Sequence, residues 1–186
     1  MSRKRLIRMS HGLHWRNRIH EDLIDDKRAR YHRTADIAVR HQHSGYEDKH
    51  ERNLRILLKG HEEDPDSLHF VKYLGYQYFN HDFREAAKWL MQTAQDQRVT
   101  HLERWHALCY AAKSYRSMEN YDKAIGAASA AVQLLPHLDD AYFELGLAYG
   151  KKGEWMKCIF WTEQGFQRAR PDDVVERAAE GYAPAL

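Results

Sequence analysis

Small and apolar residues recur every three or four positions from about residue 66 to residue 170, which is the spacing of one buried face on an α-helix. The pattern also repeats as a block, in units that start at Leu68, Trp105 and Asp139 and are therefore 37 and 34 residues apart. Positions seven, eight and eleven of the three units carry Leu74-Gly75 and Tyr78, Ala111-Ala112 and Tyr115, and Leu145-Gly146 and Tyr149. This period predicts stacked helical hairpins and favours binding over catalysis.

Small residues at position eight of each unit indicate that the two helices of a hairpin cross closely there, since a large side chain would push them apart. Pro136 and Pro171 follow the second helix of their units, where a proline prevents the helix from continuing. Gly153 and Asn120 are predicted to supply the turns inside the third and second hairpins. The fold class is therefore mainly α, a solenoid of about three helical hairpins.

The units resemble the tetratricopeptide repeat over about residues 66 to 170. A further helix is predicted before the first hairpin, because Leu54, Ile56 and Leu57 cluster in a charged stretch that runs to Pro65. Solenoid ends need such a capping element. After Pro171 the residues 172–176 can start another helix, which we expect to form a cap or a frayed tail.

The first 48 residues follow a different pattern and form a predicted domain of their own, with residues 49–186 as the helical repeat domain. Short, partly alternating stretches at residues 5–8, 13–19 and 35–40 predict two or three strands. So few short strands bury little apolar area. This segment should therefore pack on the repeats or on a partner.

Charge and composition narrow the classes of function. The formal net charge is only +2, although residues 1 to 50 hold 12 Lys and Arg against 7 Asp and Glu, so a nucleic acid partner is disfavoured. No apolar run approaches the length of a membrane span, and the two cysteines show no disulfide or metal spacing. We expect a cytoplasmic protein without a membrane span.

A second resemblance involves the residues before the repeats. In order along the chain these are Trp15, His20, Glu21, Gly45, Tyr46, Arg52, Asn53 and Leu54. Together with the repeats, this order resembles the C-terminal part of bacterial family-two glycosyltransferases that carry tetratricopeptide repeats. The resemblance implies that Trp15, His20 and Glu21 lie on the nucleotide-sugar side, with His20 as a candidate ligand of Mn²⁺ or Mg²⁺.

The catalytic part of those enzymes has no counterpart in this sequence. The GT-A domain is missing, and Asp64-Pro65-Asp66 does not replace its Asp-x-Asp metal motif. We therefore expect no transferase activity and no cofactor in this chain alone, with a divalent metal only if a GT-A domain completes the site. The alternative for His20 and Glu21 is a local polar pair at the end of a strand.

The inner face of the solenoid is the other candidate site. In tetratricopeptide solenoids, positions two, five, nine and twelve of each unit point into the concave groove. The candidates there are His69, Lys72, Tyr76, Phe79, His106, Lys113, Arg116 and Phe143. Basic and aromatic side chains together predict an extended peptide ligand with acidic and apolar groups, and the alternative is a solvated groove that only supports a catalytic domain.

Two functions remain open from the sequence. The chain is either the accessory repeat portion of a sugar-transfer enzyme, working with a separate catalytic domain, or a free-standing scaffold that binds a protein partner without catalysis. An enzyme portion should present an exposed apolar face on residues 1 to 45, whereas a free-standing scaffold should cover that face with its own helices.

Overall fold

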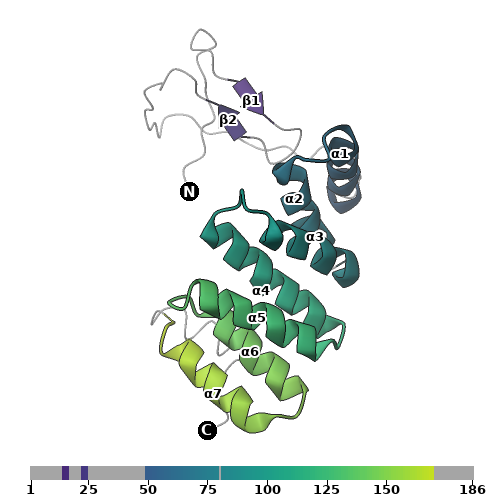
Figure 1. Cartoon of the computed structure of the whole chain (residues 1–186). Coiled ribbons are helices and arrows are strands. Elements are labelled where there is room, and N and C mark those ends of the chain that lie inside the picture. The colour runs from purple at the N-terminus through teal and green to yellow at the C-terminus, as the bar shows by residue number, and fades with distance from the viewer. Residues whose placement is uncertain (1–13, 17–21, 25–48, 80, 170–186) are drawn as a thin grey trace, which may run out of the picture.

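A computed structural model describes residues 14–16, 22–24, 49–79 and 81–169 of the chain. Seven helices and a short hairpin account for most of them (Figure 1). Their bounds are β1 His14–Arg16, β2 Asp22–Ile24, α1 Lys49–Glu63, α2 Leu68–Tyr78, α3 Phe83–Gln95, α4 His101–Ser117, α5 Tyr121–Leu134, α6 Asp140–Lys151 and α7 Trp155–Phe166.

The helices pair as the repeat predicts. α2 with α3, α4 with α5, and α6 with α7 form three hairpins, and α1 packs on α2 ahead of the first (Figure 1). Each second helix also packs on the first helix of the next hairpin, since α4 lies on α3 and α6 on α5. The predicted mainly helical, tetratricopeptide-like solenoid is confirmed.

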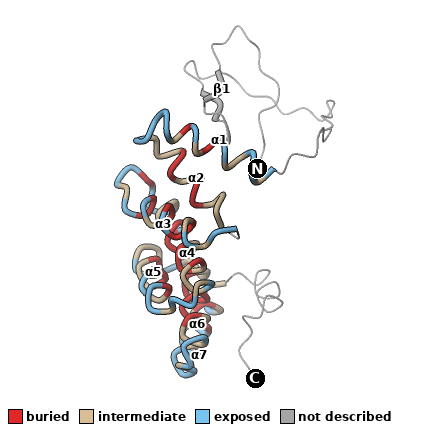
Figure 2. Tube along the Cα trace, turned by 90° about the vertical axis from the view of Figure 1, so that its right-hand side faces the viewer, coloured by how far each residue is buried: buried red, intermediate tan, exposed pale blue. Residues whose placement is uncertain are grey.

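The buried residues run through the middle of this stack (Figure 2). One core cluster joins α3 to α6 around Leu90, Trp105 and Leu145, and a second joins α1, α2 and α3 around Leu57 and Leu74. Burying one such large apolar side chain contributes about 1.5–3 kcal/mol. The second cluster shows that α1 covers the first hairpin, as expected of a capping helix.

The small residues at position eight lie where the helices of a hairpin cross. A Cβ atom added to Gly75 would stand 2.9 Å from Cγ of Leu90 and 3.1 Å from its backbone nitrogen. At Gly146 the added atom would stand 2.3 Å from Oγ1 of Thr162. The steric reason inferred from the sequence is therefore correct for both glycines.

The longer step between the first two units comes from α4. This helix has 17 residues and begins four positions before Trp105, whereas α6 begins one position after Asp139. Thr100 and Glu103 form a reciprocal capping box that stabilises the added first turn. The extra residues of the 37-residue step thus lengthen α4, and the linker between α3 and α4 stays short.

The turn predictions are correct for one hairpin and wrong for the other. Gly153 has a φ of +82°, as a glycine turn requires. In the second hairpin the positive φ of 59° belongs to Glu119, and Asn120 instead caps α5 by accepting from the backbone N–H of Lys123. Asn120 itself has a φ of −88°, so the left-handed residue of this turn is one position earlier than predicted.

At the N-terminal end, β1 pairs with β2 in antiparallel register, with Trp15 opposite Leu23. β1 falls inside the predicted stretch 13–19, whereas β2 was not expected. The predicted strands at residues 5–8 and 35–40 lie outside the described residues, so the domain division at residue 48 remains a prediction.

Candidate functional site

The first helices of the hairpins line the inner face of the solenoid. α4 contacts both α2 and α6, and these contacts are more extensive than any between α3 and α5 or between α5 and α7. Helices on the inside of a curved stack lie closer together than those on the outside. The inner face is therefore built from α2, α4 and α6.

An aromatic cluster occupies the inner face between α2 and α4. The ring of Tyr110 meets Tyr76 edge-on at 5.2 Å between centroids and Phe79 at 4.9 Å. Such edge-to-face pairs are worth roughly 0.5–1.5 kcal/mol beyond their burial. Burial, followed by the neighbouring Tyr110 and Glu103, raises the pKa of Tyr76 to about 12. Tyr76 is therefore a neutral phenol over the physiological range.

Lys113 adds a cation to this cluster. Its ammonium group lies 5.4 Å from the centroid of the Tyr110 ring, a cation–π distance. No carboxylate among the described residues forms an ion pair with Lys113 within 4 Å. We call Tyr76, Phe79, Tyr110 and Lys113 the aromatic–lysine patch.

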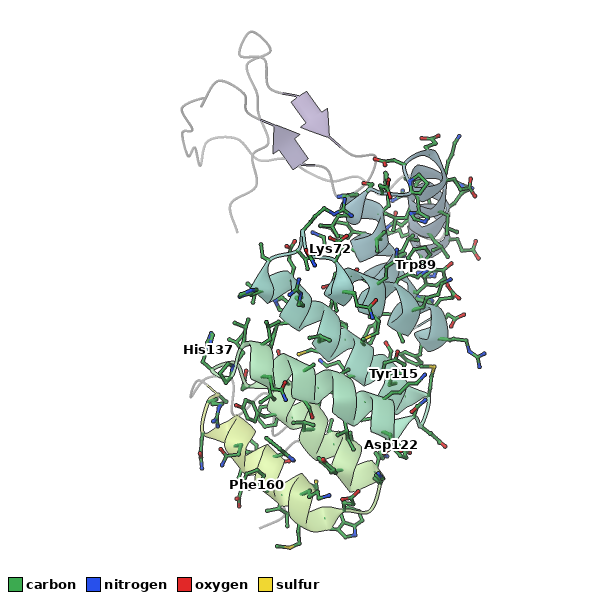
Figure 3. All side chains as sticks on the ribbon, viewed as in Figure 1. Lys72, Trp89, Tyr115, Asp122, His137 and Phe160 are labelled. Carbon is green, nitrogen blue, oxygen red and sulfur yellow. The ribbon has the colours of Figure 1, made fainter. Side chains whose placement is uncertain are left out.

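The other two predicted cations already have acidic partners. Lys72 donates to Glu103 at 2.9 Å, beside the first turn of α4 (Figure 3). Arg116 donates to Glu144 at 3.1 Å, and the Glu144 side chain is only 1% exposed. Lys72 and Thr100 together lower the pKa of Glu103 to about 2, so this pair is ionised at neutral pH. Of the Lys and Arg candidates for the groove, Lys113 is therefore the one without an acidic partner among the described residues.

Two inner-face positions turn inward instead. Phe143 is 1% exposed and packs on the Phe166 ring at 5.1 Å, so this predicted groove residue belongs to the core. Cys109 is also buried, and burial raises the pKa of its thiol. Both occupy position five of their units, and α7 covers Phe143, since a Cβ atom added to Gly165 would lie 3.0 Å from its ring.

The two histidines proposed for the groove have ring contacts outside the patch. The His69 ring contacts Phe70 and Tyr73 at 5.4 and 4.7 Å. His106 is exposed, with its ring 5.0 Å from that of Trp105. The structure thus leaves both on the surface, one on α2 and the other on α4.

The structure describes one of the three residues that were predicted to contact a sugar nucleotide or a metal ion. Trp15 lies in β1, while His20 and Glu21 lie outside the described residues. Within the described ranges no group of three or more His, Cys, Asp or Glu could hold a metal ion. Asp64-Pro65-Asp66 lies exposed at the junction of α1 and α2.

Two contributors to the inner face were missed from the sequence. Tyr110 stands at position six, which the repeat rule does not assign to the groove, yet it lies three residues before Lys113 on one face of α4. Glu103 lies in the extra turn of α4, ahead of the repeat unit. The helical spacing from Lys113 could have identified Tyr110, whereas the 37-residue step alone does not show which residues it inserts.

The fold and inner face define a tetratricopeptide-type helical repeat protein. Among solved structures the chain is similar to crystal structures of MamA, a protein of tetratricopeptide type. One has 22% sequence identity and a TM-score of 0.56, covering 66% of this chain and 75% of that one. Another, MamA AMB-1, has 15% identity and a TM-score of 0.58, covering 63% and 68%. At these identities the likeness shows the fold alone.

Comparisons by sequence add no family. A scan against protein families finds no match, and no curated protein matches the chain. A glycosyltransferase origin has no support from the comparisons. Among the described helices, none combines the length and the apolar character needed to cross a membrane.

Proposed function

We propose that the chain is a tetratricopeptide scaffold that binds an extended segment of a partner protein along the inner face of α2, α4 and α6. The MamA likeness supports the scaffold class, because proteins of this type act through protein–protein interaction. The observation that carries the proposal is the aromatic–lysine patch. It is the part of the described inner face where a cation without an acidic partner adjoins a surface of three aromatic rings.

The chemistry of the patch defines the ligand. Aromatic rings take up an apolar or aromatic side chain, and Lys113 favours a carboxylate next to it in the peptide. Lys72 and Arg116 contribute little attraction, since Glu103 and Glu144 neutralise them. The preferred segment should therefore carry one acidic group close to an apolar anchor.

Selection from a random peptide library displayed on phage, with the full chain as bait, tests this specificity. Peptides that combine an acidic and an apolar residue should be enriched. A selected peptide with a fluorescent label then gives a dissociation constant by anisotropy, and that affinity should weaken as salt increases.

Charge reversal provides the matched control. Lys113→Glu should weaken the peptide about tenfold or more, which corresponds to about 1.4 kcal/mol. Lys123→Glu makes the same change in net charge on α5, a second helix, and should leave affinity unchanged within about twofold. Equal affinities for the two variants, or no enrichment of acidic peptides, would refute the proposed site.

The glycosyltransferase interpretation makes a separate prediction. Sequencing the coding DNA upstream of Met1 would find a reading frame for a GT-A domain with an Asp-x-Asp motif if the chain works with such a domain. The peptide measurements do not depend on that result, so the two interpretations can be tested independently.

A further inference from the structure

α7 presents four exposed apolar side chains at the end of the stack opposite α1. Trp155, Met156, Ile159 and Phe160 are 67%, 80%, 46% and 52% exposed. Their spacing of one, four and five residues puts them on one face of the helix, and Figure 3 shows Phe160 at this end of the molecule. A contiguous apolar surface of this kind marks an interaction site. We call these four residues the α7 face.

The α7 face is wider than the surface that joins one hairpin to the next. Residues of α5 and α7 correspond with a shift of 34, so the counterparts of Met156 and Phe160 are Asp122 and Gly126. Both counterparts stay exposed although α6 packs on α5, and a Cβ atom added to Gly126 would have nothing within 4 Å. A helix packed on α7 as α6 packs on α5 would therefore leave Met156 and Phe160 uncovered. An occupant of the whole face has to reach further over α7 than α6 reaches over α5.

The other side of α7 is already packed on α6. A Cβ atom added to Gly150 of α6 would lie 3.1 Å from the Sγ atom of Cys158. The ammonium group of Lys157 lies 5.0 Å from the centroid of the Tyr149 ring, which also belongs to α6. The α7 face is thus the side of the helix that is turned away from its own hairpin.

The α7 face is symmetric about its own midpoint. Along the chain it reads aromatic, aliphatic, two other residues, aliphatic and aromatic. When a second α7 lies antiparallel across this midpoint, Trp155 of one copy is opposite Phe160 of the other, and Met156 is opposite Ile159. An interface with a two-fold axis requires a patch that is complementary to itself. The α7 face meets this requirement.

The charges at the two ends of α7 also suit an antiparallel pair. Lys151 and Lys152 lie just before the helix, and Asp122 neutralises one of the two charges by accepting from Lys152 at 2.6 Å. Glu163 is exposed three residues after Phe160 on the same face, and no described cation pairs with it. The same two-fold axis places Glu163 of one copy opposite Lys152 of the other. It also brings together opposite ends of the two helix dipoles.

The area of the α7 face is sufficient for a weak dimer. At about 200 Å² for a large side chain in full exposure, the four side chains offer about 500 Å² on each copy and about 1,000 Å² on two. This total reaches the lower end of the range for specific interfaces, so the expected dissociation constant is in the micromolar range.

We infer that the α7 face joins two copies of the chain end to end, with the two α7 helices antiparallel across a two-fold axis. The competing occupants are another segment of the same chain and a different protein, and each of these leaves the purified chain a monomer. The interface is separate from the aromatic–lysine patch on α2 and α4, so the inference does not depend on the proposed peptide ligand.

Sedimentation velocity of the full chain tests the inference and should show monomers and dimers in equilibrium between about 1 and 200 μM. Phe160→Glu should raise the dissociation constant of the dimer by about a hundredfold, because the two-fold axis introduces the change twice. Leu102→Glu is the matched control, since Leu102 on α4 is 51% exposed, and it should leave the dissociation constant unchanged within about twofold. Met156→Glu alters the most exposed of the four positions and should act as Phe160→Glu does, with the circular dichroism of the unmodified chain.

Disulfide formation tests the antiparallel register. In a chain that carries Cys158→Ser, Met156→Cys and Ile159→Cys are prepared separately, one of them isotope-labelled, and the two are mixed and oxidised. Disulfides between Cys at position 156 and Cys at position 159 should outnumber those between identical positions. The inference is overturned if the chain is a monomer throughout the concentration range, if Phe160→Glu and Met156→Glu leave the dimer intact, if Leu102→Glu weakens it equally, or if disulfides between identical positions dominate.

Discussion

Two glycines at different places in the solenoid should respond in opposite directions to the same substitution. Gly75 lies in α2 at the crossing with α3, and Gly126 lies exposed in α5. Replacing a helical glycine by alanine gains about 0.5–1 kcal/mol from helix propensity at either site. What differs is the space that the new methyl group would enter.

At Gly75 the methyl group would lie 2.9 and 3.0 Å from two side-chain atoms of Leu90 and 3.1 Å from its backbone nitrogen. The side chain of Leu90 can rotate, but the backbone contact can be relieved only by moving α3 away from α2. Overpacking of this kind costs about 1–3 kcal/mol. Gly75→Ala should therefore destabilise the fold by up to about 2 kcal/mol after the propensity gain is subtracted.

At Gly126 no atom lies within 4 Å of the added methyl group. Gly126→Ala should therefore stabilise the fold by about 0.5–1 kcal/mol. Urea unfolding followed by far-UV circular dichroism gives both changes, with equal slopes required for the comparison. If Gly75→Ala is as stable as Gly126→Ala, the close crossing of α2 and α3 is not what requires a small residue at position eight.

Three further outcomes are expected. Glu103→Gln should lower the melting temperature at pH 7, because it removes an interaction of about 1 kcal/mol with Lys72 and Thr100. The pKa of Glu103 is lowered to about 2, so the difference in melting temperature from the unmodified chain should persist above pH 4.5 and disappear as the pH falls to 2. A difference that stays constant over this range would contradict the ionised pair. Glu119→Gly should raise the free energy of unfolding by about 0.5–1 kcal/mol, because φ at Glu119 is +59° and its counterpart in the next hairpin is Gly153. A loss of stability in thermal unfolding would argue against the left-handed turn. Alkylation of the native protein, read by peptide mass mapping, should modify the half-buried Cys158 well before the buried Cys109, and equal rates would contradict the burial of α4.

Much of the fold could be predicted from the sequence because each repeat position has a steric requirement. Gly75 and Gly146 are small since helices cross there, and Leu74 and Leu145 are buried since position seven faces the core. The turn of the second hairpin could not be located the same way, because Asn120 can serve either as a turn residue or as a cap. The hydrogen bond to Lys123 decides between these roles and depends on how α5 begins.

The site was harder to predict than the fold, because a repeat position fixes where the Cα atom of a residue lies but not which groups its side chain contacts. Lys72 and Arg116 occupy groove positions, but Glu103 and Glu144 from the first helix of the next hairpin pair with their charges. Phe143 also occupies a groove position, but its ring packs on Phe166 and is buried in the core. The first two outcomes depend on contacts between hairpins and the third on packing between α6 and α7, and the spacing of repeat positions contains neither.

The two ends of the solenoid follow from the same nearest-neighbour logic. A repeat is stabilised by the units on either side, so an end unit needs a substitute for its missing neighbour. At one end α1 supplies it, with Leu57 fully buried and Gly60 so close to Phe70 that an added Cβ would lie 2.3 Å from the ring. At the other end α7 leaves Trp155, Met156, Ile159 and Phe160 exposed, whereas α6 packs on the corresponding helix α5. The aromatic–lysine patch lies on α2 and α4, which have neighbouring helices on both sides, so the stack itself holds the surface that a partner protein would meet.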